Sequence, residues 1–502
     1  MAGKKISTAA SPKAPIESVA FVSLGCPKNL VDSEKMLGLL AEDGIAITPD
    51  HEQADAIVIN TCGFLEASKT ESLQVIREAV EQKRRAGKTG REKRIIVAGC
   101  LVQRHRARLL DEIPEIDALV GVFDRANIVT AVRGAGSAGA GADMGAFHPV
   151  SAFISKHDRS RTGYTDNDQA RLRLTPRHYA YLRISEGCNQ GCTFCTIPSI
   201  RGRMRSKPLA AILAEARELI SDGAFEINLI GQDTTSYGQD IGYGGAGEGL
   251  AGLIRELNRI DDLGWIRLMY AYPSCFTDEM IGSIADAGRV VKYIDMPLQH
   301  INDDILHAMR RKVTRRDIET LLGKLRRQIP GITLRTTLIS GFPGETEAQH
   351  QELLQFVRNF EFDCLGVFEF SPEPGTPAGR LHQTNAIAPG VRARRKSELM
   401  QAQQQVAFAK NRRMAGQTLS VLVDEVGRRG GFAKARHAGQ APEIDSRVLL
   451  RGGAVAPGEL VRAVVEDWEN YDLVARPAQL GIRGGGKHTD RGMSLPILES
   501  AR

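Results

Sequence analysis

Short apolar runs rich in β-branched residues alternate with longer amphipathic segments in the first part of the chain. The run DAIVINT, for example, is followed by ESLQVIREAVEQKRR, whose apolar residues recur at helical spacing. Strand and helix in regular alternation predict a parallel sheet with helical crossovers. The strands expected here are 18–24, 55–61 and 94–99. We therefore predict an α/β front domain over residues 16–133.

A second alternating series begins at Tyr179 and contains six strand candidates separated by amphipathic segments such as LAAILAEARELISD. Six such units predict an open or partial (β/α)6 barrel over residues 174–412. In parallel βα architectures the functional groups lie on the loops at the carboxyl ends of the strands. The expected strands are 179–185, 225–231, 265–271, 291–296, 332–340 and 364–370.

Beyond residue 416 the pattern contains strands alone, which predicts a small antiparallel β-barrel of OB-like type over 413–480. The expected strands are 418–426, 447–452, 459–468 and 471–477. The helix before them, at about 390–414, has few large apolar residues and is predicted to be a solvated connector.

Three segments have a composition that does not favour packing. Residues 134–173 include GAGSAGAGADMG followed by a polar stretch, and we predict an interdomain linker there. The two ends of the chain, 1–15 and 481–502, are predicted to be disordered tails.

The composition is that of a globular protein with several domains. At roughly 150 residues per domain, 502 residues suggest about three. The contents of hydrophobic (42%) and charged (25%) residues exclude a wholly disordered, collagen-like or membrane-embedded chain. No apolar run approaches the roughly 18 residues that span a bilayer, and no export signal opens the chain, so we expect a cytoplasmic protein with no membrane partner. The net charge of +6 permits a nucleic-acid partner without requiring one.

Three of the eight cysteines, Cys188, Cys192 and Cys195, are crowded in CNQGCTFC directly after the first strand of the second series. Eight cysteines are too few for a disulfide scaffold, and three thiolates on one loop can hold a four-iron cluster with one iron left open. The alternative is a zinc site, for which Cys275 could supply a fourth ligand. The spacing lacks the paired CxxC knuckles typical of zinc ribbons, which favours iron and sulfide.

Three further cysteines, Cys26, Cys62 and Cys100, each come immediately after a β run of the front domain. In a parallel sheet they would emerge at the same edge, where they could hold a second cluster. The alternative is that they are buried packing residues, a common role of free cysteine. Packing is also the expected role of the isolated Cys275 and Cys364.

The CxxxCxFC pattern resembles the cluster motif of the radical S-adenosylmethionine (SAM) enzymes, whose fold is a partial (β/α)6 barrel. The resemblance implies that Cys188, Cys192 and Cys195 bind a [4Fe-4S] cluster whose open iron is chelated by SAM. An electron from the cluster would cleave SAM to methionine and a 5′-deoxyadenosyl radical. The residues expected to contact SAM are Phe194, Gln232, Asp233 and Gly341.

Gln232 and Asp233 follow the second strand of the barrel, and Gly341 begins GFPGET after the fifth. A tight turn is the alternative explanation for both sequences. His300, after the fourth strand, either faces the pocket or is a hydrogen-bonded structural histidine.

Over residues 16–480 the chain resembles the methylthiotransferase family, which combines a Rossmann-like front domain, a radical SAM barrel and a TRAM-type, OB-like barrel. The resemblance implies that Cys26, Cys62 and Cys100 hold an auxiliary [4Fe-4S] cluster that carries sulfur. SAM would be used twice, as methyl donor and as radical source, with a flavodoxin or ferredoxin as electron donor.

The segments VSLGCPKNLVDSE, ISEGCNQGCTFCTIPSIRGRMRSKP and VFEFSPEPGTPA resemble the RimO-type branch of this family. That branch methylthiolates the β-carbon of an aspartate in small-subunit ribosomal protein S-twelve. A tRNA adenosine methylthiotransferase is the enzymatic alternative, and a non-enzymatic, zinc-dependent RNA-binding protein is the alternative from another class.

Charge in the C-terminal barrel bears on this choice. Between residues 416 and 480 there are eight basic and nine acidic residues, a net charge of −1, whereas an RNA-binding barrel should be basic. One acidic and aromatic run suits a cationic protein partner, although a charged strand edge that resists aggregation would look the same. Its members are Glu466, Asp467, Trp468, Glu469, Tyr471 and Asp472. The cations Arg392, Arg394, Arg395, Lys396, Arg412 and Arg413 could touch ribosomal RNA or simply keep their helix soluble.

Overall fold

The computed structural model describes residues 16–134, 151–156, 167–245, 247–427 and 431–478. In the front domain, apolar strands that are buried along nearly their whole length form a six-stranded parallel sheet in the order β2-β1-β3-β4-β5-β6. A sheet buried on both faces explains the near-continuous apolar runs of the sequence. The strands are β1 (Ser18–Ser23), β2 (Ala46–Ile47), β3 (Ala56–Thr61), β4 (Arg94–Gly99), β5 (Ala118–Val120) and β6 (Ser151–Phe153).

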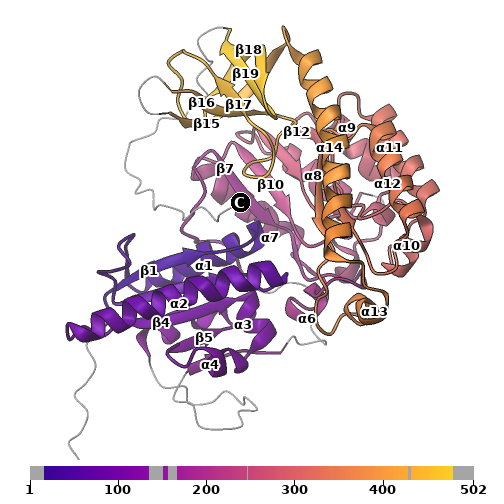
Figure 1. The fold of residues 1–502 in the computed structure, drawn as a ribbon. Helices are drawn as coiled ribbons and strands as arrows, with labels where there is room; N and C mark the ends of the chain where they lie inside the picture. Colours follow the sequence, from indigo (N-terminus) through magenta and orange to yellow (C-terminus); the bar gives the residue numbers. More distant parts are fainter. Residues whose placement is uncertain (1–15, 135–150, 157–166, 246, 428–430, 479–502) are drawn as a thin grey trace, which may run out of the picture.

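Helices cover both faces of this sheet, with separate apolar clusters beneath α1 and α5 and beneath α2 to α4. Figure 1 shows this domain in indigo and purple. The helices are α1 (Pro27–Glu42), α2 (Glu66–Lys88), α3 (Cys100–His105), α4 (Arg108–Glu112) and α5 (Ile128–Arg133). The three strands expected from the sequence are present, and β2, β5 and β6 are additional.

Part of the segment predicted to be a linker is ordered structure. Strand β6 extends the front sheet by pairing in parallel with β5, and Asp168 is 1% exposed. Three residues are too few to show an alternating pattern, and Asp168 is buried through ion pairs rather than apolar packing, so composition did not reveal either feature. The predicted tails, 1–15 and 481–502, lie outside the described residues.

The central domain contains all six expected strands, in the sequential and parallel order β14-β13-β12-β11-β10-β7. They are β7 (Tyr179–Arg183), β10 (Glu226–Ile230), β11 (Trp265–Leu268), β12 (Val290–Asp295), β13 (Thr333–Ser340) and β14 (Cys364–Glu369). An antiparallel pair, β8 (Ser185–Glu186) and β9 (Arg205–Ser206), flanks the first strand. The strands therefore form an open, partial barrel, as predicted.

The barrel helices pack their apolar faces on the outside of these strands, forming the largest core of the molecule. They are α7 (Leu209–Ser221), α8 (Gly249–Asn258), α9 (Asp278–Asp286), α10 (Asp303–Ala308), α11 (Arg315–Gln328) and α12 (Glu347–Phe360). Two further helices, α6 (Ile197–Ile200) and α13 (Pro377–Asn385), pack in smaller apolar clusters. Short 3₁₀ turns occupy η1 (Arg125–Asn127), η2 (Gln239–Ile241) and η3 (Pro273–Cys275).

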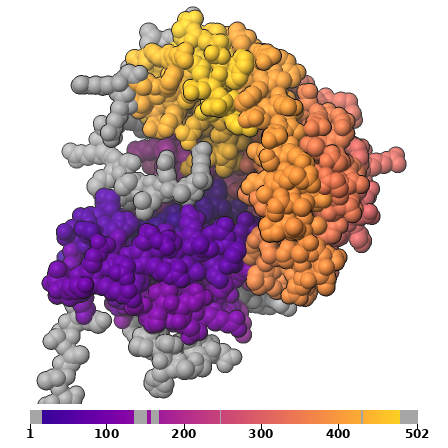
Figure 2. All heavy atoms as spheres, in the orientation of Figure 1, coloured from indigo at the N-terminus to yellow at the C-terminus, as the bar shows by residue number. Residues whose placement is uncertain are grey.

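Helix α14 (Pro389–Met414) is a packed element, so the expectation of a solvated connector is wrong. Leu399, Ala402 and Val406 lie on one face and are buried against the barrel, and Gln403 donates a hydrogen bond to the Phe362 carbonyl at 2.9 Å. A narrow stripe with a small residue at its centre allows close approach without many large side chains. Figure 1 shows α14 running along the central barrel to the C-terminal domain. In the same orientation, Figure 2 shows α14 in orange and the C-terminal domain in yellow on the surface of the molecule.

The C-terminal domain is a closed barrel in the order β15-β16-β17-β19-β18. Its strands are β15 (Thr418–Val426), β16 (Ala433–His437), β17 (Val448–Leu450), β18 (Leu460–Glu469) and β19 (Asp472–Pro477). All pairs are antiparallel except β17 with β19. Strand β16, with the sequence AKARH, was not expected because it lacks β-branched residues. Within the described part of the chain, no helix is both long and apolar enough to cross a bilayer.

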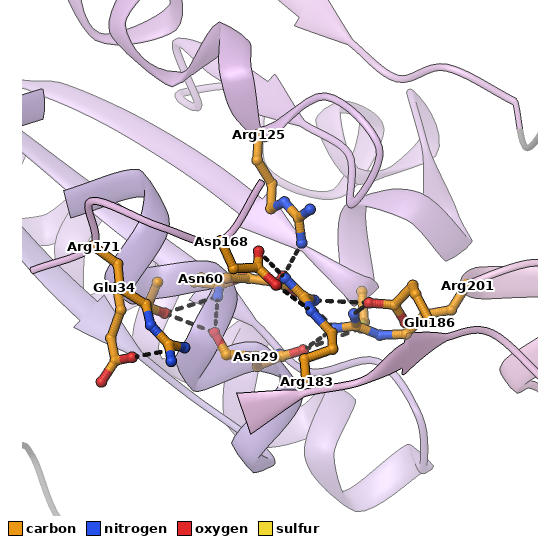
Figure 3. Close-up of polar contacts among 12 residues, drawn as sticks. Asn29, Glu34, Asn60, Arg125, Asp168, Arg171, Arg183, Glu186 and Arg201 are labelled. Carbon is orange, nitrogen blue, oxygen red and sulfur yellow. Dashed lines mark hydrogen bonds and ion pairs between the residues drawn. The ribbon is translucent and has the colours of Figure 1, made fainter. Parts of the chain in front are cut away.

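A continuous network of buried ion pairs joins the front domain to the central barrel (Figure 3). Arg183 of β7 is its centre, because its guanidinium contacts Asp32 of α1 at 2.6 Å, Asp168 at 2.6 Å and Glu186 at 2.7 Å. Among the described residues the network contains five cations and five carboxylates. They are Arg125, Arg171, Arg183, Arg201, Lys207, Asp32, Glu34, Asp168, Glu186 and Glu215.

Nearby cations lower the pKa of three of these carboxylates, Asp32, Asp168 and Glu186, whereas burial raises the pKa of Glu34. Burial by itself would raise the pKa of Asp168, but Arg183 and Lys207 hold that pKa well below its ordinary value. The pKa of Asp32 is lowered in the same way by Arg125, Arg183 and Arg201 against the effect of burial. Removing one member would leave a charge buried without its partner, so the network fixes the relative position of the two domains.

We expect Asp168→Asn to destabilise the fold by about 3 kcal/mol, because Arg183 and Lys207 would lose a buried counter-charge. The matched control is Asp222→Asn, which removes a carboxylate that is 47% exposed and pairs with Arg173. That change should cost less than about 1 kcal/mol. Urea unfolding followed by circular dichroism measures both, and equal midpoints for the two variants would contradict the role given to the network.

Candidate metal centres

The carboxyl ends of three adjacent front-domain strands bring Cys26, Cys62 and Cys100 to one edge, as the sequence predicts. Strands β1, β3 and β4 are neighbours, and their ends are in register, with Ser23 opposite Asn60 and Thr61 opposite Gly99. Neighbouring strands lie about 4.8 Å apart, so the three cysteines that follow them can converge on one small group.

Two glycines make this convergence sterically feasible. Gly25 has a φ of +95°, and a Cβ on it would lie 2.8 Å from the Cβ of Cys62. Gly99 has a φ of +97°, and a Cβ there would lie 2.7 Å from the Thr61 carbonyl oxygen. A larger residue at either position would therefore displace the loops that carry the thiols.

Asn29 ties these loops together and reaches toward the second domain. Its Nδ2 donates to the carbonyls of Leu24 at 3.1 Å and Thr61 at 2.9 Å, and its Oδ1 lies 3.3 Å from the Sγ of Cys100. The same Oδ1 accepts a hydrogen bond from Arg201, which comes from the central barrel. Asn29 thus links the front cysteine edge to the interdomain network.

The front thiols differ in their electrostatic surroundings. Burial raises the pKa of Cys62, and it raises the pKa of Cys100 to about 12. Burial acts in the same direction on Cys26, but Lys28, Arg201 and backbone N–H groups outweigh it and lower the pKa of that thiol. Three buried sulfur donors with cations beside them suit a metal group that displaces protons and carries negative charge.

The second cysteine trio lies on the loop between β8 and α6, at the carboxyl end of β7. The loop is held at both ends, since the Cys188 N–H donates to the Gly202 carbonyl at 3.2 Å and the Thr193 N–H donates to the Met309 carbonyl at 3.1 Å. Burial raises the pKa of both Cys188 and Cys195 to about 12.

Arg311 and Tyr272 line this second trio. The Nη1 atom of Arg311 lies 3.6 Å from the Sγ of Cys192. The Arg311 guanidinium lies 4.0 Å from the centre of the Tyr272 ring. The Tyr272 hydroxyl is 3.9 Å from the same sulfur. A thiolate or an iron-sulfur group here would therefore have an adjacent cation.

The spacing of the sulfur atoms argues against zinc. The one set of three described residues whose ligand atoms all lie within 4.8 Å of one another is Glu347, His350 and Glu398, so in neither cysteine trio do all three sulfurs lie that close. Two thiolates on one zinc ion, at about 2.3 Å each, cannot be more than about 4.6 Å apart. A cluster in which each thiolate binds its own iron accommodates the wider spacing.

The predicted SAM contacts lie at the expected strand ends, although the protein already uses several of their polar atoms. Asp233 accepts hydrogen bonds from Gln190 at 2.6 Å, the Ser236 hydroxyl at 2.6 Å and the Thr235 hydroxyl at 2.8 Å. Because Gln190 belongs to the cysteine loop, Asp233 holds that loop in place. The amide of Gln232 donates to Glu186 at 2.6 Å.

Gly341 has a φ of +70°, and its N–H donates to Glu345 at 2.6 Å. Phe194 packs in an apolar cluster that includes Phe342 of the same GFPGET loop. Contact of Phe194, Gln232, Asp233 and Gly341 with SAM stays a prediction.

The residues that the sequence left open have structural explanations. His300 is fully buried, its Nδ1 accepts the Asn302 N–H at 3.0 Å, and burial lowers its pKa to about 3, which fits a structural histidine. Cys275 is not simply packed, because its sulfur lies 3.4 Å from the Gln190 amide and 3.3 Å from the Ser236 hydroxyl beside the cysteine loop. Burial raises the pKa of Cys364 well above its ordinary value.

The acidic and aromatic run forms the hairpin between β18 and β19. Part of it serves the fold: Trp468 lies under Arg412, and Tyr471 packs on Phe408 with ring centres 5.5 Å apart. Glu466, Asp467, Glu469 and Tyr471 remain exposed. A partner-binding role for this run stays a prediction.

The basic residues of α14 have internal partners. Arg394 pairs with Glu347 and Glu398, Arg395 pairs with Glu345, and Lys396 lies 3.7 Å from Glu369. Ion pairs within the chain thus engage these cations, and contact of the basic residues of α14 with ribosomal RNA stays a prediction.

Sequence reasoning did not identify Asn29, Lys28, Arg201 and Arg311 as residues of the site. Asn29 and Lys28 had a weak signal, because they lie within three positions of Cys26. Arg201 and Arg311 reach their cysteines only through the tertiary structure, and no local pattern marks them.

Three family models match the chain in the order of its domains. They are the uncharacterized protein family UPF0004 at residues 18–121, the radical SAM superfamily at 182–357 and the TRAM domain at 415–477. Among solved structures, the radical S-adenosylmethionine methyltransferase TsrM from Kitasatospora setae, with cobalamin and a [4Fe-4S] cluster bound, has a TM-score of 0.52 at 17% identity. It covers 75% of this chain and 80% of its own, which indicates a shared fold.

Closer relatives cover nearly the whole chain. A protein of Trichlorobacter lovleyi described as "Ribosomal protein uS12 methylthiotransferase RimO" is 42% identical over 460 residues, 91% of this chain and 98% of the relative. A protein of Geobacter sulfurreducens with the same description is 42% identical over 459 residues, with the same coverage.

We expect the two cysteine trios to load separately. Anaerobically reconstituted protein should contain about eight irons per chain, and Cys62→Ala and Cys192→Ala should each lose about four. Only Cys192→Ala should also lose SAM cleavage, because the cluster held by Cys188, Cys192 and Cys195 would provide the open iron that binds SAM. Iron and sulfide analysis and 5′-deoxyadenosine formation measure this.

Cys364→Ser is the matched control, since it removes a buried thiol outside both trios and should keep all of the iron. Zinc without sulfide, or 5′-deoxyadenosine production by Cys192→Ala, would contradict the assignment.

Proposed function

The chain belongs to the RimO family of ribosomal protein uS12 methylthiotransferases, and we propose that it methylthiolates the β-carbon of an aspartate in uS12, the small-subunit protein S-twelve. The observation that carries this proposal is the placement of two cysteine trios on either side of one domain boundary. Asn29, which lies beside Cys100, accepts a hydrogen bond from Arg201, and Arg201 pairs with Glu186 just before the second cysteine loop.

In this proposal Cys26, Cys62 and Cys100 hold an auxiliary [4Fe-4S] cluster, and Cys188, Cys192 and Cys195 hold the radical SAM cluster. When bound, these groups supply a carbon radical from SAM on one side of the boundary and sulfur on the other. Two separate groups are needed because an unactivated C–H bond must be broken before a C–S bond can replace it. The protein supplies orientation and exclusion of water.

The chain's own residues orient the two trios. Arg201 donates a hydrogen bond to Asn29 of the front domain and pairs with Glu186. Glu186 lies two residues before Cys188, the first cysteine of the second loop. Asp233 fixes that loop through Gln190, and Arg311 places a positive charge beside Cys192. These contacts hold both loops against the same rigid network.

The boundary is also dry. Asn29, Asp32 and Arg201 are each about 1% exposed, and Glu186 is 3% exposed. Because a carbon radical reacts with whatever hydrogen donors reach it, a packed polar boundary protects the reaction from side products.

A basic pocket beside the second trio suits delivery of the electron. It has a volume of about 780 Å³ and opens next to the cysteine loop. Its lining residues are Asn189, Gln190, Gly191, Thr193, His307, Ala308, Arg310, Arg311 and Lys312. No carboxylate lines this pocket among the described residues, so an acidic flavodoxin or ferredoxin is the electron donor that we propose.

Two observations disfavour the alternatives. The net charge of −1 in the C-terminal barrel does not suit a tRNA substrate. The sulfur spacing disfavours a zinc-dependent RNA-binding protein. A ribosomal substrate also supports a cytoplasmic location.

Incubation of the reconstituted protein with SAM, a reductant and purified uS12 should add one methylthio group in place of one hydrogen on an aspartate. Mass spectrometry of the intact protein and its peptides measures the adduct. Parallel reactions with tRNA separate the enzymatic alternatives, and modification of tRNA alone would overturn the proposed substrate.

Arg310→Glu should lower the rate supported by flavodoxin about tenfold, because electrostatic steering of an acidic donor would be weakened. The rate with dithionite, a small chemical reductant, should stay near the wild-type value. Arg316→Glu makes the same charge change on an exposed residue outside the pocket and serves as control. Equal losses in both variants would remove the pocket from the electron-transfer route.

A further inference from the structure

Lys28 is a nearly buried cation that crosses the domain boundary. It lies on α1, two residues after Cys26, and is 7% exposed. Its ammonium lies 3.2 Å from the centre of the Tyr270 ring, which follows β11 of the central barrel. The front domain therefore extends this side chain to the carboxyl edge of the barrel strands, where the active site of such a fold is built.

This ammonium has no carboxylate counter-ion among the described residues, since none lies within 4.0 Å of it. The acidic groups that act on the two residues are the Cys26 thiol and Asp295. Cys26 would be bound in the auxiliary cluster, and Asp295 accepts the Tyr270 N–H at 3.2 Å and pairs with Arg335 at 2.7 Å. A cation–π contact only partly replaces the water that a buried ammonium loses, so the site favours an incoming anion.

The backbone of Tyr270 supports a functional placement of this ring. Its φ is +60°, in the left-handed region that bulky residues rarely occupy. Such strain persists where the surrounding structure determines it, and it concentrates at ligand sites. The Thr234 N–H donates to the Tyr270 carbonyl at 3.1 Å, and the contact to Asp295 holds the other side of the residue.

The position between the two trios indicates which anion belongs there. Lys28 is two residues from Cys26, while Tyr270 is two residues from Tyr272, whose hydroxyl lies 3.9 Å from the Sγ of Cys192. A group bound by Lys28 therefore lies between the proposed sources of radical and sulfur. In an aspartate side chain the carboxylate is bonded directly to the β-carbon, so holding the carboxylate at this point also places the carbon that must react.

We propose that the Lys28 ammonium binds the side-chain carboxylate of the substrate aspartate, with the Tyr270 ring holding the ammonium in place. This assignment rests on the proposed function and deepens it, because it makes Lys28 the residue that selects an acidic side chain. Lys28 contacts the substrate and takes no part in bond making. A residue that only offset negative charge at Cys26 would instead affect the aspartate and asparagine substrates equally.

The test compares wild type, Lys28→Gln and Lys28→Arg as anaerobically reconstituted holoenzymes. The substrates are uS12 and a uS12 variant in which the target aspartate is asparagine. For the aspartate substrate, Lys28→Gln should raise both the Kd, measured without SAM, and the KM about 10- to 100-fold, the usual range for loss of a charged hydrogen bond. Lys28→Arg keeps the positive charge and should retain most of the affinity.

The asparagine substrate completes a double-mutant cycle. Wild type should bind it about as weakly as Lys28→Gln binds the aspartate substrate, and Lys28→Gln should cause little further loss, because the interaction is already absent. Iron content should match wild type, because Lys28 is not one of the proposed cluster ligands. Lys35→Gln is the matched control, since Lys35 lies on the same helix and donates to the Gln169 carbonyl at 2.7 Å.

Two results would overturn the Lys28 assignment alone: an unchanged Kd in Lys28→Gln, or equal losses on the aspartate and asparagine substrates. A wild-type enzyme that modifies tRNA and never uS12 would overturn the proposed function, and the Lys28 assignment with it. The wild-type reaction therefore distinguishes the two failures.

Discussion

The buried ion network between the front domain and the central barrel is the constraint on which both metal centres depend. Arg183 contacts carboxylates from the front domain, from the segment before the barrel and from the cysteine-loop side of the barrel. Paired charges in a buried network tolerate little displacement. When two oppositely charged groups move apart in a medium of low polarity, their attraction weakens and water does not replace it. The network therefore serves geometric specificity, which two-centre chemistry requires, more than it serves net stability.

The sequence predicted those parts of the fold and site that local patterns encode. All nine strands expected in the front and central domains are present because their short apolar runs stand out from the longer amphipathic helices between them. The six cysteines were recognisable because each front-domain cysteine follows a strand and the other three share one loop. Strands β6 and β16 were missed because three residues, or a run of small and basic residues, produce no such pattern.

Residues that act across the domain boundary could not be predicted in the same way. Arg201 and Asn29 are 172 positions apart, and nothing near Arg201 in the sequence indicates that it reaches the front cysteines. Asp168 lies in a segment of low apolar content, and its burial depends entirely on Arg183 and Lys207. Helix α14 was misinterpreted for a related reason, since a narrow apolar stripe and buried polar side chains replace the broad apolar face that sequence patterns detect.

The same boundary explains why the reaction needs two domains rather than one elaborated barrel. In the proposed reaction sulfur and radical approach one carbon from different groups, and each group would be held by three thiols at the carboxyl edge of a parallel sheet. The carboxyl edge of the central sheet already carries the loop with Cys188, Cys192 and Cys195 and the strand ends proposed to contact SAM. The other trio must therefore come from the front-domain sheet, across the domain boundary. A substrate side chain can then enter only at the boundary, and a specificity residue must lie there too. Lys28, which lies on helix α1 of the front domain and contacts the ring of Tyr270 in the central domain, meets this requirement with a single side chain.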